Sequence, residues 1–330
     1  MTKRKTSYYK QKRAKWRLRI FCGALATIMA LLVMTVPVSA FSVEEEAFAA
    51  SEAAAAAAST AGARSTSKID YRLPGVSNKS IYAHTRMSAI VNGATLSEPA
   101  LKINGITYLP LRAATTALGA GSVSYNSASR TMTVSGRGLY LSATDGGYVT
   151  YANDRPLFSF SPNVVMSNGR MYIPASAFAK ATGTRFELRG SAVYLDGTFS
   201  PLASAKRFYR DDEVLWLARI ISAEAKGESL LGQIAVGDVI LNRVKSPLYP
   251  NTIYGVIFDR RYGIQFSPVG NGTIYNTPSY TATLAAKICL EGTSLSDNAL
   301  FFVNPVKAPG SWISRSREYA YTIGNHDFYL

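Results

Sequence analysis

The pattern of apolar and polar positions changes along this chain of 330 residues. Between about residues 82 and 197, short β segments alternate with Ala-rich helical stretches, and Asn-Gly turns separate the strands. From about residue 205 onward the pattern is that of longer helices. The segment DDEVLWLARIISAEAKG, residues 211–227, has apolar residues at the spacing of one buried helix face, at positions 214, 217, 218 and 221.

The ends of this helix carry recognisable residues. Asp211 or Asp212 is suited to cap its N-terminus, with Glu213 in the first turn, and Gly227 is expected to end it. The next segment, SLLGQIAVGDVILNRV, is apolar on nearly all sides, as a central core helix should be. Its two glycines, Gly232 and Gly237, allow close approach by a neighbour. Asp238, between apolar residues, is expected to be a local surface feature.

An internal repeat with an offset of 64 residues organises the first region. INGITYLP at residues 103–110 recurs as SNGRMYIP at residues 167–174. Each copy continues into an Ala-rich helix closed by a glycine and then an alternating strand, TMTVSG or SAVYLDG. The predicted unit is therefore strand, turn, strand, helix, strand, given twice. The equivalent pairs are Asn104 and Asn168, Gly105 and Gly169, Tyr108 and Tyr172, Pro110 and Pro174, and Gly119 and Gly183.

The N-terminal forty residues are typical of a secretory signal. A basic stretch ends at Arg19, an apolar run covers residues 20–36, and VSA at residues 38–40 suits a signal peptidase. We predict cleavage after Ala40, although seventeen apolar residues also reach the lower limit for an uncleaved membrane anchor. Residues 41–80 are an Ala/Ser-rich linker, or a helical stalk. Without the leader, which contains Cys22, Cys289 is the only thiol, so no internal disulfide is expected.

Length and composition support two folded domains. An apolar fraction of 47% and a charged fraction of 17% are those of a globular protein. The net charge is +15, but the first forty residues contribute nine Lys and Arg and no acid, which leaves +6. That excess suits an anionic polymer such as a bacterial wall. The chain has no zinc-finger, RRM or basic-zipper pattern, so we do not expect a nucleic-acid partner.

Glu224 is the candidate catalytic residue. It follows Leu217, Ile220 and Ile221 at i−7, i−4 and i−3, so its carboxyl group faces an apolar sector at the end of the helix. Burial raises the pKa of a carboxyl group, and a protonated carboxylic acid near neutral pH is a general acid for glycosidic cleavage. A Glu that reaches solvent, or pairs with Arg219 or Lys226, would fit the same spacing.

The loops after these helices are rich in amides and aromatic rings, the groups that recognise sugar hydroxyls and the apolar faces of sugars. They contain the segments YPNTIYGVI, QFSPVGNGTIYNTPS, LFFVNP, GSWISR and TIGNHDFY. The candidate substrate-binding residues are Gln265, Phe266, Ser267, Asn304, Trp312 and His326.

Together with ISAEAKGES, these segments resemble the cell wall hydrolase family of the SleB/CwlJ type, the spore cortex-lytic enzymes, over about 120 residues. The resemblance implies a lysozyme-like, largely α-helical domain that cuts the glycan of peptidoglycan, with Glu224 as its catalytic acid. The repeat, through NG-x-x-Y-x-P and the following helix, resembles the copper amine oxidase N-terminal-like domain. A copper site needs several imidazoles, and this region has only His84. We therefore expect a wall-binding or spacing module, or a domain with no ligand.

The predicted fold class is α+β, with a β-rich α/β repeat module at residues 81–199 and a mainly α-helical catalytic domain at residues 205–330. We expect peptidoglycan as the partner, a secreted or wall location, membrane contact only through an uncleaved leader, and no cofactor or metal. A two-carboxylate glycosidase needs a second acid, and neither Glu228 nor Asp238 has a clear claim, so a lytic transglycosylase fits better. Cortex lysis at germination is one possible role.

Three other functions remain open. A zinc amidase needs about three protein ligands, whereas His84 and His326 lie in different domains and HExxH is absent. A cysteine peptidase would need Cys289, which we expect to be a small core residue, together with His326. A non-catalytic wall-binding protein on a lysozyme-like scaffold is the third alternative.

Overall fold

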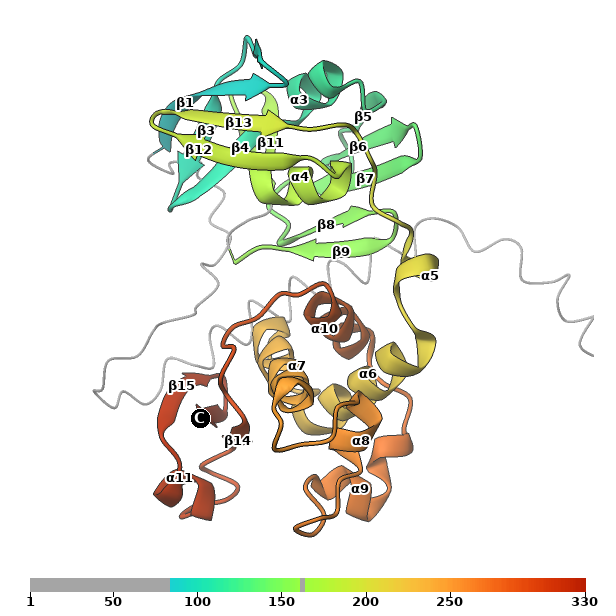
Figure 1. Ribbon diagram of the computed structural model, residues 1–330, viewed down its shortest axis with the longest axis vertical. Helices are drawn as coiled ribbons and strands as arrows, with labels where there is room; N and C mark the ends of the chain where they lie inside the picture. The colour runs from blue at the N-terminus through green and yellow to red at the C-terminus, as the bar shows by residue number, and fades with distance from the viewer. Residues whose placement is uncertain (1–83, 161–163) are drawn as a thin grey trace, which may run out of the picture. The chain divides into compact units, whose positions relative to one another are not determined.

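The computed structural model describes residues 84–160 and 164–330 (Figure 1). The predicted leader at residues 1–40 and linker at residues 41–80 lie outside the described residues. The repeat module contains β1 (His84–Val91), β2 (Ala94–Thr95), β3 (Ala100–Ile103), β4 (Ile106–Pro110), α3 (Leu111–Leu118), β5 (Ser122–Asn126), β6 (Thr131–Gly136), β7 (Leu139–Thr144), β8 (Val149–Ala152), β9 (Arg155–Phe158), β10 (Val165–Ser167), β11 (Arg170–Pro174), α4 (Ala175–Thr182), β12 (Arg185–Arg189) and β13 (Ala192–Asp196).

The strands of the module form two sheets. One has eight strands in the order β10-β11-β4-β3-β1-β13-β12, with β2 paired to β1, and the other has five in the order β5-β6-β7-β8-β9. The two copies of the repeat meet where β4 and β11 pair antiparallel, and Leu109 lies opposite Ile173. These residues are separated by the 64-residue offset, so the copies are related by a local two-fold axis at this point. The repeat predicted from the sequence is therefore confirmed.

Two features of the module differ from the prediction. Each helix is followed by a hairpin, β5–β6 or β12–β13, rather than by a single strand. The first strand of each hairpin is exposed along most or all of its length, so it has no alternation of buried and exposed positions for the sequence to reveal. The strands β7, β8 and β9 between the copies were also not predicted.

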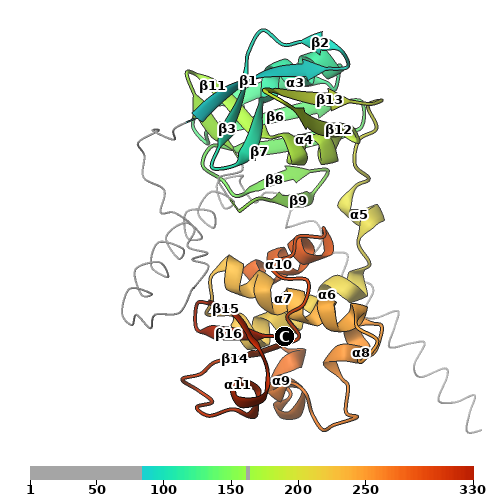
Figure 2. The same ribbon diagram turned by 60° about the vertical axis from the view of Figure 1, so that its left-hand side comes forward.

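The C-terminal domain is built on three helices that pack against one another, α6, α7 and α10 (Figure 2). Gly237 permits the contact, because a Cβ there would lie 2.7 Å from Sγ of Cys289 and 3.0 Å from Cδ1 of Ile221. A three-stranded sheet has the order β14-β16-β15. The elements are α5 (Ala205–Phe208), α6 (Asp211–Ala225), α7 (Leu230–Lys245), α8 (Ile253–Ile257), α9 (Ser267–Asn271), a 3-10 helix η1 (Thr273–Tyr275), α10 (Tyr280–Leu290), β14 (Phe301–Val303), α11 (Trp312–Ser316), β15 (Tyr319–Ile323) and β16 (His326–Tyr329).

The expected apolar face of α6 is confirmed, but the expected cap is wrong. Arg210 occupies the N-cap without a side-chain hydrogen bond, and Asp211, Asp212 and Glu213 all lie in the first turn, where their charges favour the helix. The helix ends at Ala225, two residues before Gly227. The mixed α+β class is confirmed, with the helical content concentrated in this domain.

Asp238 is not a surface feature, which corrects the prediction. It is 2% exposed on the central helix α7, and its Oδ2 accepts a hydrogen bond from the backbone N–H of Leu295 at 2.6 Å. Cys289 is 2% exposed and is a small core residue, as predicted. Among the residues the structure describes, no helix combines the length and apolar character needed to cross a membrane.

Candidate active site

Glu224 lies in the last turn of α6, next to the fully buried side chains of Leu217, Ile220 and Ile221. Burial raises its pKa to about 7, and the nearby ammonium group of Lys307 opposes this with a smaller effect. At neutral pH, Glu224 is therefore protonated in a substantial fraction of the molecules, as the sequence predicts. Within the described residues no hydrogen bond or ion pair holds this carboxyl group.

Glu228 lies just beyond the helix, and its carboxylate is already bound. Oε2 accepts the backbone N–H of Asn325 at 3.1 Å, and Oε1 accepts Nδ2 of the same residue at 2.9 Å. The amide of Gln233 also holds the backbone carbonyl of Glu228, at 2.9 Å. The side chain is thus fixed to the turn between β15 and β16 and does not offer a free carboxylate to a substrate.

The turn that Glu228 holds is narrow. Gly324 and Asn325 connect β15 to β16 as a two-residue loop, and Gly324 has a φ of 56°. A Cβ at position 324 would overlap Oε2 of Glu228. Glycine is therefore required here both by the backbone conformation and by the close approach of the carboxylate.

His326 begins β16 and is 7% exposed. Its Nδ1 lies 3.7 Å from Oε1 of Glu228 and makes no hydrogen bond with the described residues. Burial lowers the pKa of His326, while the charge of Glu228 opposes that decrease and the charge of Lys307 adds to it. The imidazole is consequently neutral at pH 7.

Three of the predicted substrate-binding residues gather near Phe302 of β14. The ring centroid of Phe302 lies 6.4 Å from that of Phe266 and 5.5 Å from that of His326. Asn304 follows β14, and its Oδ1 accepts the backbone N–H groups of Val306 and Lys307, both at 3.0 Å. Asn304 thereby shapes the loop that carries Lys307. Phe266 is only 4% exposed, so its ring supports this group from behind.

The remaining predicted residues differ in position. Gln265 and Ser267 flank Phe266; Ser267 is exposed, and Nε2 of Gln265 donates to the carbonyl of Gly263 at 3.2 Å. Trp312 is 54% exposed and packs on Phe301, with ring centroids 5.8 Å apart. Since consecutive residues of a strand face opposite sides, Trp312 lies on the other side of β14 from Phe302.

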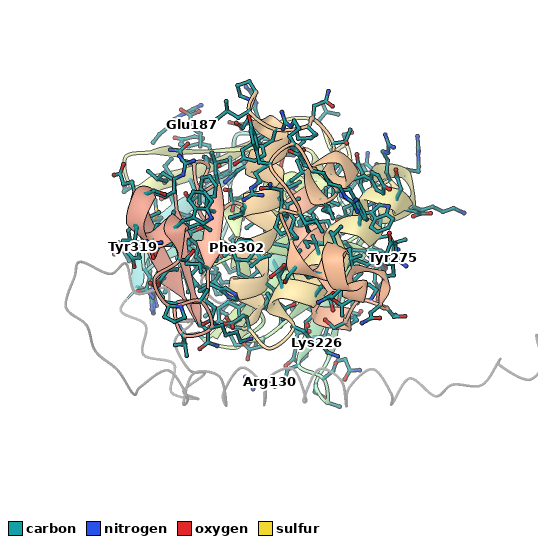
Figure 3. All side chains as sticks on the ribbon, turned by 90° about the horizontal axis from the view of Figure 1, so that it is seen from below. Arg130, Glu187, Lys226, Tyr275, Phe302 and Tyr319 are labelled. Carbon is teal, nitrogen blue, oxygen red and sulfur yellow. The ribbon has the colours of Figure 1, made fainter. Side chains whose placement is uncertain are left out.

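The sequence did not single out an aromatic group on the helical side of the domain. Trp216 of α6 makes edge contacts with Tyr254, Phe258 and Tyr275, at centroid distances of 5.2, 5.2 and 6.1 Å. Tyr254 is 53% exposed and Tyr275 is 59% exposed. In the view of Figure 3, Phe302 lies between Tyr319 and Tyr275. Trp216, Tyr254 and Tyr275 belong to the helix and loop segments that the sequence analysis describes, and Phe258 follows one of them directly, but their separation in the sequence concealed the cluster.

Three other carboxylates of the domain have structural partners. Asp259 pairs with Arg261 at 2.9 Å, Asp327 accepts a hydrogen bond from Thr322, and Asp238 is buried against Leu295. The described residues contain no group of three or more His, Cys, Asp or Glu side chains placed to hold a metal ion. Glu224 thus combines three properties: it is largely buried, its pKa is raised, and no described residue bonds to its carboxyl group.

Comparison with known proteins gives the class of each domain. Residues 227–329 match the family described as Cell Wall Hydrolase, and residues 90–193 match the Copper amine oxidase N-terminal domain. Both resemblances are therefore confirmed over their own residue ranges, with the cell wall hydrolase match C-terminal to the copper amine oxidase N-terminal domain match. Glu224 lies three residues before the first matched range.

The relatives are spore cortex-lytic enzymes. That of Bacillus cereus is 41% identical over 120 residues, which cover 36% of this chain and 45% of the relative. That of Bacillus subtilis is 38% identical over 120 residues, covering 36% and 38%. This chain thus spans less than half the length of these curated relatives. The catalytic domain of the germination-specific lytic transglycosylase SleB from Bacillus anthracis is 38% identical; the match covers 37% of this chain and 97% of that one, with a TM-score of 0.34.

Proposed function

We propose that this protein is a peptidoglycan-degrading enzyme that cuts the glycan strand between N-acetylmuramic acid and N-acetylglucosamine. The observation that carries the proposal is Glu224, whose carboxyl group has a pKa of about 7 and no bonded partner among the described residues. The relatives named spore cortex-lytic enzymes support peptidoglycan, and cortex in particular, as the substrate. The net charge of +6 beyond residue 40 suits that anionic polymer.

The proposed reaction is a transglycosylation with Glu224 as acid and then base. Protonated Glu224 gives its proton to the glycosidic oxygen as the bond between that oxygen and the anomeric carbon breaks. The resulting carboxylate then accepts the proton of the 6-hydroxyl of the same muramoyl residue as that oxygen bonds to the anomeric carbon. The products are a glycan end with a free hydroxyl and a 1,6-anhydro ring, and no water is consumed.

The position of Glu228 supports transglycosylation over hydrolysis. An inverting hydrolase needs a second carboxylate free to activate water, and a retaining hydrolase needs one free to attack the sugar. The Glu228 carboxylate is already bound by Asn325 and faces His326. A single acid is sufficient for the intramolecular reaction, because the sugar supplies its own nucleophile.

The amide and aromatic side chains of the loops in this domain are suited to a polysaccharide. We propose that Gln265, Ser267, Asn304 and Trp312 contact the glycan, and that Phe266 and His326 act from buried positions behind Phe302. The exposed rings of Tyr254 and Tyr275 provide further stacking surfaces. Residues 1–40 would direct export to the cell wall and are removed after Ala40 in this proposal. N-terminal sequencing of secreted protein checks that step, and a start at Met1 or Thr2 would favour an anchor.

Product analysis on purified peptidoglycan tests the proposed reaction. A lytic transglycosylase releases fragments that end in anhydro-muramoyl residues, whereas a muramidase leaves reducing ends that are heavier by one water. Mass spectrometry separates the two. Release of free stem peptides from an intact glycan would instead establish an amidase and overturn the proposal.

A further inference from the structure

The repeat module and the segment that follows it, as far as α5, line a cavity that the proposed reaction does not use. Its volume is about 510 Å³, within the range of small-ligand sites. It lies between the start of β7, the turn from β8 to β9, and the segment that leads into α5; the three strands and α5 are labelled in Figure 1. Its lining residues are Gly138, Tyr140, Asn153, Asp154, Pro201, Leu202, Ala203, Ser204 and Arg207.

The turn on one side of this cavity has an unusual residue. Asn153 and Asp154 connect β8 to β9 with φ values of 51° and 64°. Among the described residues, four other turns of the module also have two consecutive positive φ values, and each has glycine at the second position. These turns are Asn92-Gly93, Asn104-Gly105, Arg137-Gly138 and Asn168-Gly169. At the second position of these five turns in the described residues, only Asp154 places a side chain where glycine is favoured on conformational grounds.

The first residue of the turn, rather than Asp154, holds it in place. Oδ1 of Asn153 accepts the backbone N–H of Tyr140 at 2.7 Å, and its Nδ2 donates to the carbonyl of Leu202 at 2.6 Å. The carbonyl of Asn153 accepts the N–H of Ala205 at 2.9 Å. These bonds tie the turn to both other walls of the cavity, so the site is formed before any ligand arrives.

The Asp154 carboxylate itself makes no hydrogen bond or ion pair with the described residues, and the Arg207 guanidinium across the cavity likewise makes none. Although opposite in charge, the two groups line one cavity without an ion pair within 4.0 Å. Tyr140, on a third side, is 53% exposed. A free carboxylate, a free guanidinium and an exposed aromatic ring therefore converge on one preformed space.

We propose that this cavity is a saccharide-binding site of the repeat module. A carboxylate accepts hydrogen bonds from neighbouring sugar hydroxyls, a guanidinium donates to hydroxyl and acetamido oxygens, and a tyrosine ring packs on the apolar face of a sugar. The identity of the ligand as wall glycan rests on the proposed function. The site would retain the enzyme on its polymer independently of the cleavage at Glu224.

The test is calorimetric titration of the full chain with the tetramer of N-acetylglucosamine, in a Glu224→Gln background to prevent turnover. Asp154→Gly is the decisive added substitution, because it restores the residue of the four related turns. We expect it to increase the dissociation constant for this site at least tenfold, while the thermal midpoint holds or rises. Tyr140→Ala should weaken binding similarly. Tyr125→Ala, which removes another exposed tyrosine of the module outside the cavity, should not.

Unchanged affinity and stoichiometry in both Asp154→Gly and Tyr140→Ala would overturn the inference. The inference would also be overturned if Asp154→Gly weakened the binding of a free stem peptide but not the binding of the tetramer, because the ligand of the cavity would then be a peptide. The catalytic proposal is tested separately, by the products of the wild-type protein. Binding at the cavity in a protein that cleaves no glycan would contradict the proposed function and leave this site in place.

Discussion

Nδ1 of His326 lies 3.7 Å from Oε1 of Glu228, and both side chains are only 9% exposed. The pair joins the segment after α6 to the start of β16, two segments almost 100 residues apart in the chain. Burial disfavours the imidazolium, whereas the negative charge of Glu228 favours it. The charge of Glu228 therefore contributes to the pKa of His326 and opposes the larger effect of burial.

Substitution of Glu228 by Gln should lower the pKa of His326 further below its ordinary value. The amide keeps the shape of the side chain but removes the charge that stabilises the imidazolium. NMR titration of the imidazole protons measures the effect, and the chain has only one other histidine, His84. Cleavage of peptidoglycan should remain within roughly tenfold of wild type. A loss as large as that of a Glu224 variant would show that Glu228 is a second catalytic carboxylate.

Asp238→Asn should stabilise the folded protein above neutral pH. Burial raises the pKa of Asp238 to about 7, compared with about 3.9 when unfolded. The folded chain thus binds the proton more tightly, and the wild type loses stability as the pH rises from about 4 to 7. Asparagine can still accept the Leu295 N–H and carries no charge. We expect a gain of roughly 1–3 kcal/mol at pH 8 and little gain at pH 4, by denaturant unfolding. An equal effect at both pH values would contradict this account.

The sequence was most informative where one periodic pattern determines one structural outcome. The buried face of α6, the position of Glu224 beside Ile220 and Ile221, and the two copies of the repeat follow from local spacing. The exposed strands β5 and β12 could not be predicted, because neither face of such a strand is buried consistently. Asp238 was misjudged because its partner, the N–H of Leu295, lies 57 residues away.

The same limit applies to the candidate site. The role of Glu228 depends on Asn325 and His326, and the aromatic group around Trp216 depends on three separate segments. Lys307 was not selected at all, since a lysine in an exposed loop has no spacing that indicates its proximity to Glu224. Contacts between distant segments are set by tertiary packing, for which one sequence supplies no local pattern.

Chelation should leave the activity unchanged. The chain has two histidines, and the described residues contain no cluster of three or more metal-ligating side chains. Peptidoglycan cleavage should therefore proceed at the same rate after dialysis against EDTA, as followed by the decrease in turbidity of a wall suspension. Loss of activity that zinc restores would support the amidase alternative instead.

A fragment of residues 200–330 should fold and cleave soluble glycan fragments, since no candidate catalytic group precedes residue 205. Removal of the repeat module should cost stability mainly at Glu291, because this carboxylate accepts hydrogen bonds from Nε and Nη2 of Arg155 at 2.7 and 2.8 Å. Tyr209, which bonds to the same carboxylate at 2.6 Å, stays in the fragment. Circular dichroism checks folding and mass spectrometry checks the products. A folded but inactive fragment would show that the repeat module contributes to the active site.

Glu224→Gln should reduce peptidoglycan cleavage by at least about a hundredfold, the usual scale of general acid catalysis, while binding to peptidoglycan persists. Glutamine keeps the size and shape of the side chain but cannot give a proton to the glycosidic oxygen. Because the pKa of Glu224 is about 7, wild-type turnover should fall as the pH rises through that value, and the residual activity of the variant should not follow this profile.

Stability provides an independent control for the same substitution. The carboxyl group binds its proton more tightly in the folded chain than in the unfolded chain, where its pKa is about 4.3. Burial of the charged form therefore destabilises the wild type progressively between about pH 4 and 7. Glu224→Gln should be at least as stable as wild type at pH 8, by thermal unfolding, so its inactivity cannot be attributed to misfolding. Wild-type cleavage rates in a folded Glu224→Gln protein would refute the role proposed for this residue.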